Sequence, residues 1–253
     1  MKQKMTLCLW LGLLGAVLAS CSAATKPQEL PKEMDRSGFV VLTDVVADAI
    51  LEVRYYGTYN FVGARIDGYH EPTALLTRQA ADSLLAVSNE LKSMGYRLKI
   101  YDAYRPQEAV DHFVRWGADL ADTVMRPYFY PYVDKSRLFE LDYIAEKSGH
   151  SRGSTLDLTI FDMRTGKEVD MGGGHDWFGR ESHPDFCGNI ASETWHAENG
   201  AWTLTPEQFA NRMLLRKVMM KHGFKPYECE WWHFTLANEP YPDTYFNFPV
   251  SNR

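Results

Sequence analysis

Two short segments of this chain contain the residue types that bind transition metals. In residues 148–160, His150 and Asp157 lie on either side of a small-residue turn. In residues 230–234, Glu230 is followed three positions later by His233. Two imidazoles and one carboxylate are the ligand set of a catalytic zinc site that keeps one position open for water. The sequence therefore predicts one zinc ion per chain, bound by His150, Asp157 and His233.

The setting of Asp157 strengthens this prediction. The residue lies in an alternating run that predicts a strand, with Leu156 and Leu158 as its neighbours. An unpaired carboxylate among such side chains would be costly. The alternative is a buried salt bridge, with Arg152 as its candidate partner. Taken singly, His150 and His233 would more often be structural, and it is the combination that favours a metal site.

Two further side chains could complete a hydrolytic centre. Glu230 is not needed as a ligand, so it could take the proton of the attacking water and pass it to the leaving amine. Its alternative role is to orient His233. Because residues three apart face opposite sides of an ideal strand, a bend or bulge is expected between them. Arg105, at the end of a predicted strand, could stabilise an oxyanion, although most arginines are solvated or paired.

Three helices are predicted around these segments. Leu84, Val87, Leu91 and Met94 recur at helical spacing between Thr77 and Gly95, which predicts a helix with an apolar core face. A second helix is expected from residues 105–106, with proline at its first position, to about residue 120. A third follows the capping box of residues 205–208 and ends near residue 223.

Short extended segments are predicted at residues 39–56, 96–104, 155–161 and 224–236. Residues 60–70, 123–138 and 164–200 show no regular pattern. A long irregular segment inside a compact domain is usually functional. The mixture predicts a single α+β domain with a central antiparallel sheet flanked by helices and a zinc site in a cleft.

Composition limits the function classes. With 253 residues and 45% hydrophobic residues, the chain suits one folded domain. A net charge of −6 gives no basic surface for nucleic acid. Aromatic residues make up 13% of the chain, which fits either core packing or a pocket that encloses a small ligand. The sequence does not specify an oligomeric state.

The N-terminus predicts export. Lys2 and Lys4 precede an apolar stretch from Leu7 to Leu18 that is too short to span a bilayer comfortably. The following residues, Leu-Ala-Ser-Cys21, resemble a bacterial lipobox. We therefore expect a signal peptide at residues 1–20, a lipidated tether at 21–36 and the enzyme domain at 37–253. The protein would be anchored by Cys21 in the bacterial cell envelope, on a periplasmic or outer-membrane face. The alternative is an ordinary secretory signal.

Two cysteines remain in the expected domain, Cys187 and Cys229. An even pair in an oxidising compartment is compatible with a disulfide. Two free thiols are the alternative. Neither is expected to bind zinc, because the histidine and aspartate set is already complete.

The segments YRP (residues 104–106), SGHSRGSTLDLT (148–159) and EWWHF (230–234) together resemble the D-alanyl-D-alanine dipeptidase (VanX-type) family of zinc peptidases. The resemblance extends from about residue 43 to residue 236. It implies zinc binding by His150, Asp157 and His233, with Glu230 as the base and Arg105 near the transition state.

The same resemblance implies how substrate is bound. Tyr55, Tyr69 and Ser148 correspond to the substrate pocket, and Asp176 corresponds to the aspartate that binds the substrate amino group. Gly149 departs from the pattern, because a family member has serine before the histidine. One side-chain contact to substrate therefore has no counterpart here.

The expected function is zinc-dependent hydrolysis of D-Ala-D-Ala or a similar small dipeptide in the cell envelope. A related alternative is a zinc D,D- or L,D-carboxypeptidase or endopeptidase that trims peptidoglycan stem peptides. An alternative of another class is a non-catalytic lipoprotein that binds through zinc. Glu230 and Arg105 argue against that last alternative, because a pure binder needs neither.

Overall fold

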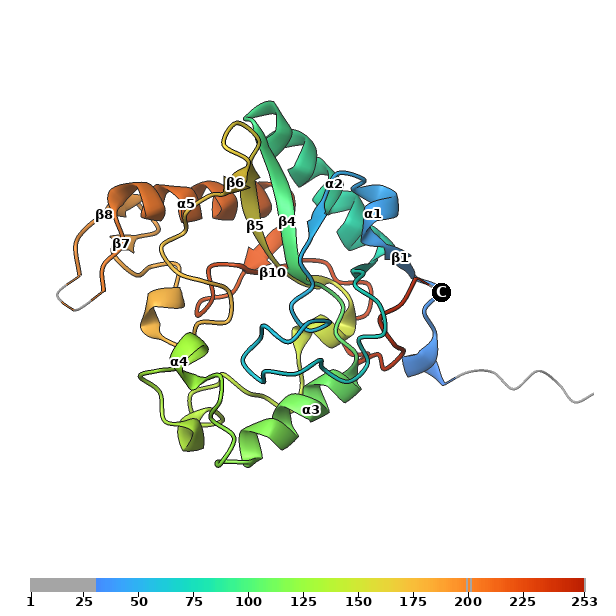
Figure 1. Cartoon of the computed structure of the whole chain (residues 1–253). Coiled ribbons are helices and arrows are strands. Elements are labelled where there is room, and N and C mark those ends of the chain that lie inside the picture. Colours follow the sequence, from blue (N-terminus) through green and yellow to red (C-terminus); the bar gives the residue numbers. More distant parts are fainter. Residues whose placement is uncertain (1–30, 199, 201, 253) are drawn as a thin grey trace, which may run out of the picture. The chain divides into compact units, whose positions relative to one another are not determined.

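A six-stranded sheet forms the centre of the domain (Figure 1). The computed structural model describes residues 31–198, 200 and 202–252. Cys21, the expected signal peptide and most of the expected tether lie outside these residues. Among the described residues, no helix has the length and apolar character needed to cross a membrane.

The main path of the sheet runs through β2 (Ile50–Leu51), β4 (Tyr96–Asp102), β5 (Thr155–Asp162), β10 (His233–Leu236) and β9 (Phe224–Pro226). The short strand β6 (Lys167–Glu168) pairs with the far end of β5. All of these pairs are antiparallel except β2 with β4, which is parallel. The predicted α+β class with a largely antiparallel central sheet is therefore confirmed.

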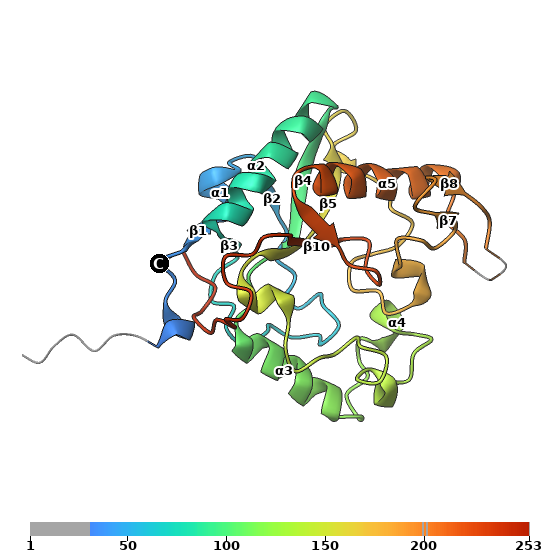
Figure 2. The same cartoon turned by 180° about the vertical axis from the view of Figure 1, so that it is seen from behind.

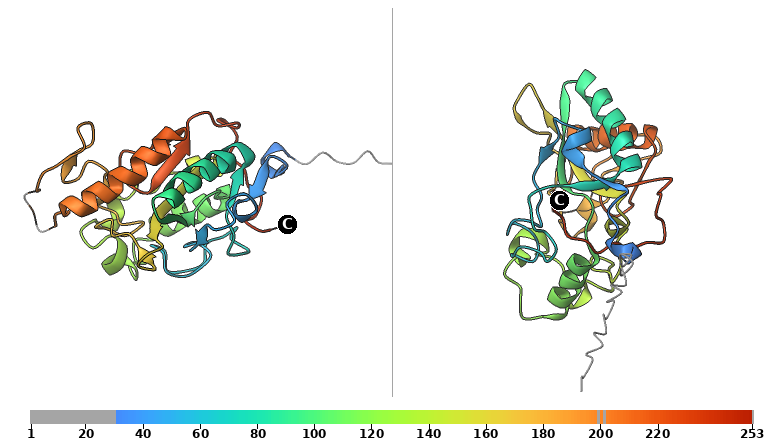
Figure 3. Two further views of the ribbon diagram at one scale, coloured as in Figure 1. Left: turned by 90° about the horizontal axis from the view of Figure 1, so that it is seen from above. Right: turned by 90° about the vertical axis from the view of Figure 1, so that its right-hand side faces the viewer.

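Two long helices, α2 (Arg78–Ser93) and α5 (Pro206–Lys221), pack against the sheet and against each other (Figures 2 and 3). The Thr77 side chain caps α2 by accepting a hydrogen bond from the amide of Ala80. Thr205 and Gln208 form the predicted capping box of α5. Both helix starts are therefore as predicted. The exception is Met94, which lies just after α2 and is 45% exposed instead of buried.

These helices and the strands enclose the first hydrophobic core. Its members are fully or almost fully buried and include Leu84, Val87, Leu91, Leu156, Leu158, Ile160, Leu215, Val218 and Trp232. Leu156, Leu158 and Ile160 project from one side of β5, as the alternation predicted. This packing fixes the direction in which Asp157, between Leu156 and Leu158, must point.

A second core, rich in aromatic rings, lies around α3 (Gln107–Ala118). Its rings include Tyr55, Phe61, Tyr69, Tyr104, Phe113, Trp116, Tyr130 and Phe178. Pro106 is the residue before α3 instead of its first helical residue, and the helix ends at Ala118. Residues 123–138, which show no regular sequence pattern, form α4 (Arg126–Phe129) and a 3₁₀ helix at Lys135–Arg137.

Shorter elements complete the domain. β1 (Phe39–Val41) pairs with β3 (Leu75–Thr77), and β7 (Gly188–Asn189) pairs with β8 (Thr194–Trp195). α1 spans Leu42–Val45, and 3₁₀ helices span Lys32–Met34, Gly149–Arg152 and Arg180–Ser182. The last residues of the expected tether contact the domain, since the Asn247 amide donates to the carbonyl of Glu33.

The two cysteines do not form a disulfide. Cys187 is a buried free thiol, and Cys229 is a partly buried one. The Cys187 sulfur lies 3.2 Å from Thr203 Oγ1 and accepts a hydrogen bond from the amide of Leu204. The structure thus favours the free-thiol alternative.

Candidate metal centre and substrate pocket

The 3₁₀ helix at Gly149–Arg152 presents His150 to the site. Ser148 caps this helix, because its Oγ accepts a hydrogen bond from the His150 amide at 3.2 Å. Gly153 ends it in the left-handed conformation, with φ at +80°. A Cβ atom at Gly153 would also clash with the ring of Phe39. Glycine is therefore required at this turn, which leads directly into β5.

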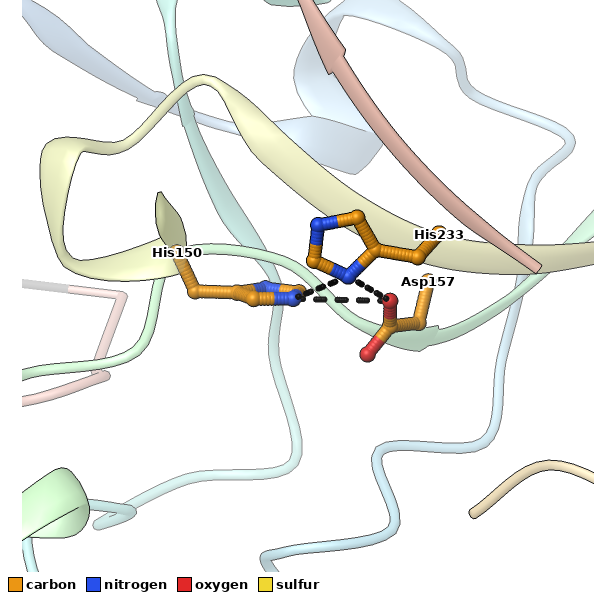
Figure 4. Close-up of side chains that lie close together, drawn as sticks. All are labelled: His150, Asp157 and His233. Atoms are coloured by element: carbon orange, nitrogen blue, oxygen red, sulfur yellow. Dashed lines mark hydrogen bonds and ion pairs between the residues drawn. The ribbon is translucent and has the colours of Figure 1, made fainter. Parts of the chain in front are cut away.

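Asp157 and His233 come from neighbouring strands and are direct partners in the register of β5 and β10. Side chains of partner residues lie on the same face of a sheet, so the carboxylate and the imidazole meet. Figure 4 shows the three side chains His150, Asp157 and His233 converging. Residues 148–160 and residues 230–234 are thus joined by the antiparallel pairing of β5 with β10.

The spacing of the three facing atoms suits a metal ion. His150 Nε2 lies 3.3 Å from His233 Nδ1 and 3.4 Å from Asp157 Oδ1, and the remaining pair is 3.2 Å apart. Ligands on a tetrahedral zinc ion with bonds of 2.0–2.1 Å are separated by about 3.3 Å. Asp157 Oδ1 is also buried with no hydrogen-bond partner among the described residues. The donor set therefore fits a metal ion.

The tautomer of His150 is fixed by the backbone. Its Nδ1–H donates a hydrogen bond to the carbonyl oxygen of Ala103 at 2.7 Å. The proton is thereby kept on the nitrogen that faces away from the site, and Nε2 is left as a free donor of its electron pair. Burial and the neighbouring carboxylates act differently on His233: burial alone would lower its pKa, but Asp157 and Glu230 raise it to about 9.

An irregularity in β4 brings in a second buried aspartate, Asp102. The pairing of β4 with β5 shifts register between Ile100 and Asp102, which places Asp102 opposite Asp157. Asp102 accepts hydrogen bonds from Tyr69 Oη at 2.6 Å and from Arg105 Nε at 3.0 Å. Bulges next to active sites commonly re-aim a side chain in this way. Sequence reasoning did not identify Asp102, although a charged residue at the end of a buried strand was a signal of the same kind as Asp157.

Arg105 reaches the edge of the metal centre. Its Nη2 lies 2.9 Å from Asp102 Oδ2 and 3.7 Å from Asp157 Oδ2, and its guanidinium lies over the ring of Tyr55. Burial alone would lower the pKa of Arg105, but Tyr55, Asp102 and Asp157 raise it well above its ordinary value. Arg105 is therefore a fixed positive charge beside the site, and the buried ion pair of Asp157 is formed with Arg105, not with Arg152. Arg152 instead pairs with Glu239 at 2.7 Å.

Glu230 lies beside the proposed ligands without replacing one. Its Oε2 is 3.3 Å from His233 Nδ1, and its side chain is 27% exposed. The two residues face the same way because Glu230 precedes β10 in a turn, where the His233 amide donates to the Glu230 carbonyl. The expected bend is thus a turn before the strand instead of a bulge within it.

A cavity of about 220 Å³ opens onto this cluster. Its walls carry the aromatic rings of Tyr55, Phe61, Phe113, Phe178, Tyr143 and Tyr227, together with Arg105, Ser148, Asp157, Asp176, Glu230 and His233. Clefts for drug-sized ligands usually measure 300–1,000 Å³. The cavity is therefore suited to a small, charged ligand.

Asp176 also lines this cavity. It accepts a hydrogen bond from Tyr55 Oη, at 3.0 Å to Oδ2 and 3.2 Å to Oδ1. Burial raises the pKa of Asp176 to about 6, even though the neighbouring His175 favours its charge. A buried carboxylate of this kind gains a partner when a cation enters the cavity.

Neither Tyr69, which was predicted to contact substrate, nor His175 lines the cavity. Tyr69 is 2% exposed, and its hydroxyl donates a hydrogen bond to Asp102. His175 was not identified from the sequence. Its Nε2 lies 3.3 Å from Asp157 Oδ2 and its Nδ1 lies 3.4 Å from Asp176 Oδ2. No local pattern in the sequence reveals such contacts between distant segments.

The chain matches a family model described as D-ala-D-ala dipeptidase, peptidase M15, over residues 35–251. It is 37% identical over 215 residues to the D-alanyl-D-alanine dipeptidase of Enterococcus faecalis, covering 85% of this chain and 99% of that protein. Over 213 residues it is 36% identical to the dipeptidase of Enterococcus faecium and 37% identical to that of Streptomyces coelicolor. Each of these two alignments covers 84% of this chain and 98% of the relative.

Proposed function

Because the chain belongs to the M15 peptidase family of D-Ala-D-Ala dipeptidases, we propose that it hydrolyses D-Ala-D-Ala or a similar small dipeptide with one bound zinc ion. The observation that supports a metal ion is the triangle of ligand atoms 3.2–3.4 Å apart, one of which is a buried carboxylate oxygen without a hydrogen-bond partner among the described residues. His150, Asp157 and His233 would hold the ion. Two imidazoles with one carboxylate favour zinc over magnesium or calcium, which prefer oxygen ligands.

When bound, zinc supplies Lewis acidity, which polarises the peptide carbonyl and lowers the pKa of water. Glu230 provides the base, because its carboxylate lines the cavity, is partly exposed and lies next to His233. It accepts a proton from the attacking water and returns it to the leaving amine. The carbonyl carbon gains the hydroxyl, the C–N bond breaks, and two free amino acids are released.

Arg105 acts on the negative charge that develops on the carbonyl oxygen, and Asp176 acts on the positive charge of the substrate ammonium group. Arg105 is held rigidly by Asp102 through Nε and Nη2, so its positive charge lies beside Asp157 without reorganisation. A preorganised cation of this kind stabilises the oxyanion that develops on the carbonyl. Asp176, steadied by the Tyr55 hydroxyl, provides the negative charge for a substrate ammonium group.

The small cavity and buried Asp176 favour a free dipeptide over a stem peptide. A substrate extended at its amino end would put an acylated nitrogen near Asp176 and would leave that carboxylate unpaired. Such a loss is costly in a buried site. Tyr69 is not part of this binding proposal, because it contacts Asp102 instead of the cavity.

The decisive experiment compares free D-Ala-D-Ala, its N-acetylated form and a cell-wall stem peptide as substrates of the zinc-loaded domain. We expect cleavage of the free dipeptide and a loss of at least about tenfold on acetylation, equivalent to one lost charge pair of about 1.4 kcal/mol or more. Asp176→Asn should weaken the free dipeptide mainly through KM and leave the acetylated one nearly unchanged. Equal cleavage of blocked and free substrates would instead support the carboxypeptidase alternative.

We also propose that the enzyme is a lipoprotein of the bacterial envelope, with signal peptide 1–20, tether 21–36 and catalytic domain 37–253. The support is the basic start and the Leu-Ala-Ser-Cys21 sequence. Cys21→Ser should shift the protein from the membrane fraction or leave it unprocessed, which fractionation and intact-mass analysis would detect. Identical mass and fractionation of the variant and the wild type would exclude the anchor.

A further inference from the structure

We propose that His175 is a positioning residue that links the substrate-binding carboxylate Asp176 to the metal ligand Asp157. The Asp176 half of this proposal rests on the function proposed above. The Asp157 half depends only on metal binding. His175 does not line the cavity and is not one of the three predicted ligands, so its role would be exerted through these two carboxylates.

The two nitrogens of the His175 ring face two different carboxylates. Nε2 lies 3.3 Å from Asp157 Oδ2, within hydrogen-bonding distance, and Nδ1 lies 3.4 Å from Asp176 Oδ2. On Asp157, the oxygen that faces His150 and His233 is Oδ1. The contact with His175 therefore uses the other oxygen. It constrains the rotation of the carboxylate so that Oδ1 points toward the metal centre.

The surroundings of His175 hold its ring in one orientation. The imidazole is stacked on Tyr101 at 4.7 Å with an interplanar angle of 27°. The ring of Trp232 meets it edge-on at 5.4 Å, and the His175 side chain is 1% exposed. Trp232 belongs to the same EWWHF segment as Glu230 and His233. A side chain packed this tightly can transmit position between its two polar partners.

The backbone supports the same geometry. Asp176 has a positive φ of 62°, an uncommon conformation for a residue with a side chain. Consecutive side chains in an extended segment would point in opposite directions, whereas here His175 and Asp176 both turn toward the site. The left-handed backbone at Asp176 thus brings its carboxylate beside Nδ1 of the preceding residue, His175.

The competing explanation is that His175 only fills the space between Tyr101 and Trp232. Side-chain chemistry separates the two explanations, because the amide nitrogen of asparagine takes the place of Nδ1 and that of glutamine takes the place of Nε2. His175→Asn then retains a donor toward Asp176 alone, and His175→Gln retains one toward Asp157 alone. His175→Phe fills the space and retains neither.

The test measures zinc affinity by competition with a chromophoric chelator, and KM for free D-Ala-D-Ala at saturating zinc. We expect His175→Asn to weaken zinc binding roughly 10- to 100-fold with KM close to wild type. His175→Gln should raise KM with zinc affinity close to wild type. His175→Phe should show both losses. Equal effects of the Asn and Gln variants, or wild-type behaviour of His175→Phe, would overturn the proposal.

Failure of the proposed function would be recognised separately. If the wild type does not cleave free dipeptides, the KM measurement is lost but the zinc competition still tests the contact with Asp157. If the substituted proteins do not fold, as judged by thermal melting, His175→Ala with added imidazole provides the second route. His175 borders a second cavity of about 550 Å³, from which imidazole would enter the space left by the ring. Restored zinc affinity would support the proposal, and no restoration in a folded variant would refute it.

Discussion

At the scale of single residues, the site consists of charges that constrain one another. Asp157 faces two histidines through Oδ1 and one through Oδ2. Burial alone would raise its pKa, but His150, His175 and His233 hold it well below the usual value. Asp157 therefore remains ionised, which is the state a metal ligand needs. Glu230 borders this cluster through His233, and Asp176 borders it through His175.

Glu230→Gln should retain bound zinc and reduce turnover of D-Ala-D-Ala by at least about a hundredfold, since it removes a base but no ligand. Glu228→Gln is the matched control, because Glu228 is exposed and does not line the cavity. Kinetics combined with metal analysis check the result. Near-normal turnover of the zinc-bound variant would reduce Glu230 to the role of orienting His233.

The raised pKa of Asp176, about 6, predicts a pH dependence of substrate capture. Below that pH the carboxyl group is neutral and cannot pair with a substrate ammonium, so kcat/KM for the free dipeptide should fall as pH decreases. One unit below the pKa, about a tenth of the groups are ionised, which gives a drop of about tenfold at pH 5.

Asp176→Asn should have a lower kcat/KM at neutral pH and lack this step. Because acid also releases zinc from its ligands, bound metal must be measured at each pH. A wild-type profile that is flat between pH 7 and 5 with full zinc occupancy would contradict the assignment of Asp176.

At the scale of elements, the site depends on one strand pair and two turns. The register of β5 with β10 brings Asp157 to His233, and the shifted register of β4 brings in Asp102. The turn before β10 carries Glu230, and the 3₁₀ helix that ends at Gly153 carries His150. An error in either turn should therefore damage catalysis as well as stability.

Gly153→Ala tests this dependence. The left-handed backbone costs a non-glycine residue about 1–2 kcal/mol, and the clash with Phe39 adds roughly 1–3 kcal/mol. Gly166→Ala is the matched control, because Gly166 has φ of +68° but no heavy atom within 4 Å of an added Cβ. Urea unfolding should show the larger loss for Gly153→Ala, which alone should also lose activity. Equal losses in both variants would show that the contact with Phe39 is unimportant.

At the scale of the whole domain, the metal centre lies between the two hydrophobic cores. Trp232 and Leu158 belong to the core under α2 and α5, whereas Tyr55 and Phe113 belong to the aromatic core around α3. The cavity is lined partly by that second core. A metal ion that joins β5, β10 and the His150 turn should therefore stabilise the fold as a whole.

Removal of zinc should abolish activity and lower the melting temperature. An ion present at a hundred times its Kd contributes about 2.7 kcal/mol. For a domain of this size that corresponds to roughly 5–11 °C. Calorimetry of the chelated and the zinc-reloaded protein checks the shift, with magnesium as the control that should not restore it. Identical melting of the two forms, with metal analysis proving removal, would contradict the proposed site.

The sequence by itself determined the features that depend on residue type and on short spacing. The helix starts at Thr77 and Thr205 follow from local capping, and the buried face of β5 follows from the alternation of Leu156, Leu158 and Ile160. The residues named as ligands, His150, Asp157 and His233, also lie together. A carboxylate is rare in an apolar strand, so the combination of Asp157 with the two histidines could be singled out from the sequence alone.

Only the tertiary structure decided which distant side chains share a hydrogen bond. Tyr69 contacts Asp102 instead of the cavity, His175 lies between Asp157 and Asp176, and Cys187 and Cys229 are free thiols. Each of these facts depends on strand register, on a bulge or on backbone torsion in a loop. Such features arise from the packing of the entire domain, because hydrogen bonds between distant segments have no periodic signal along the chain.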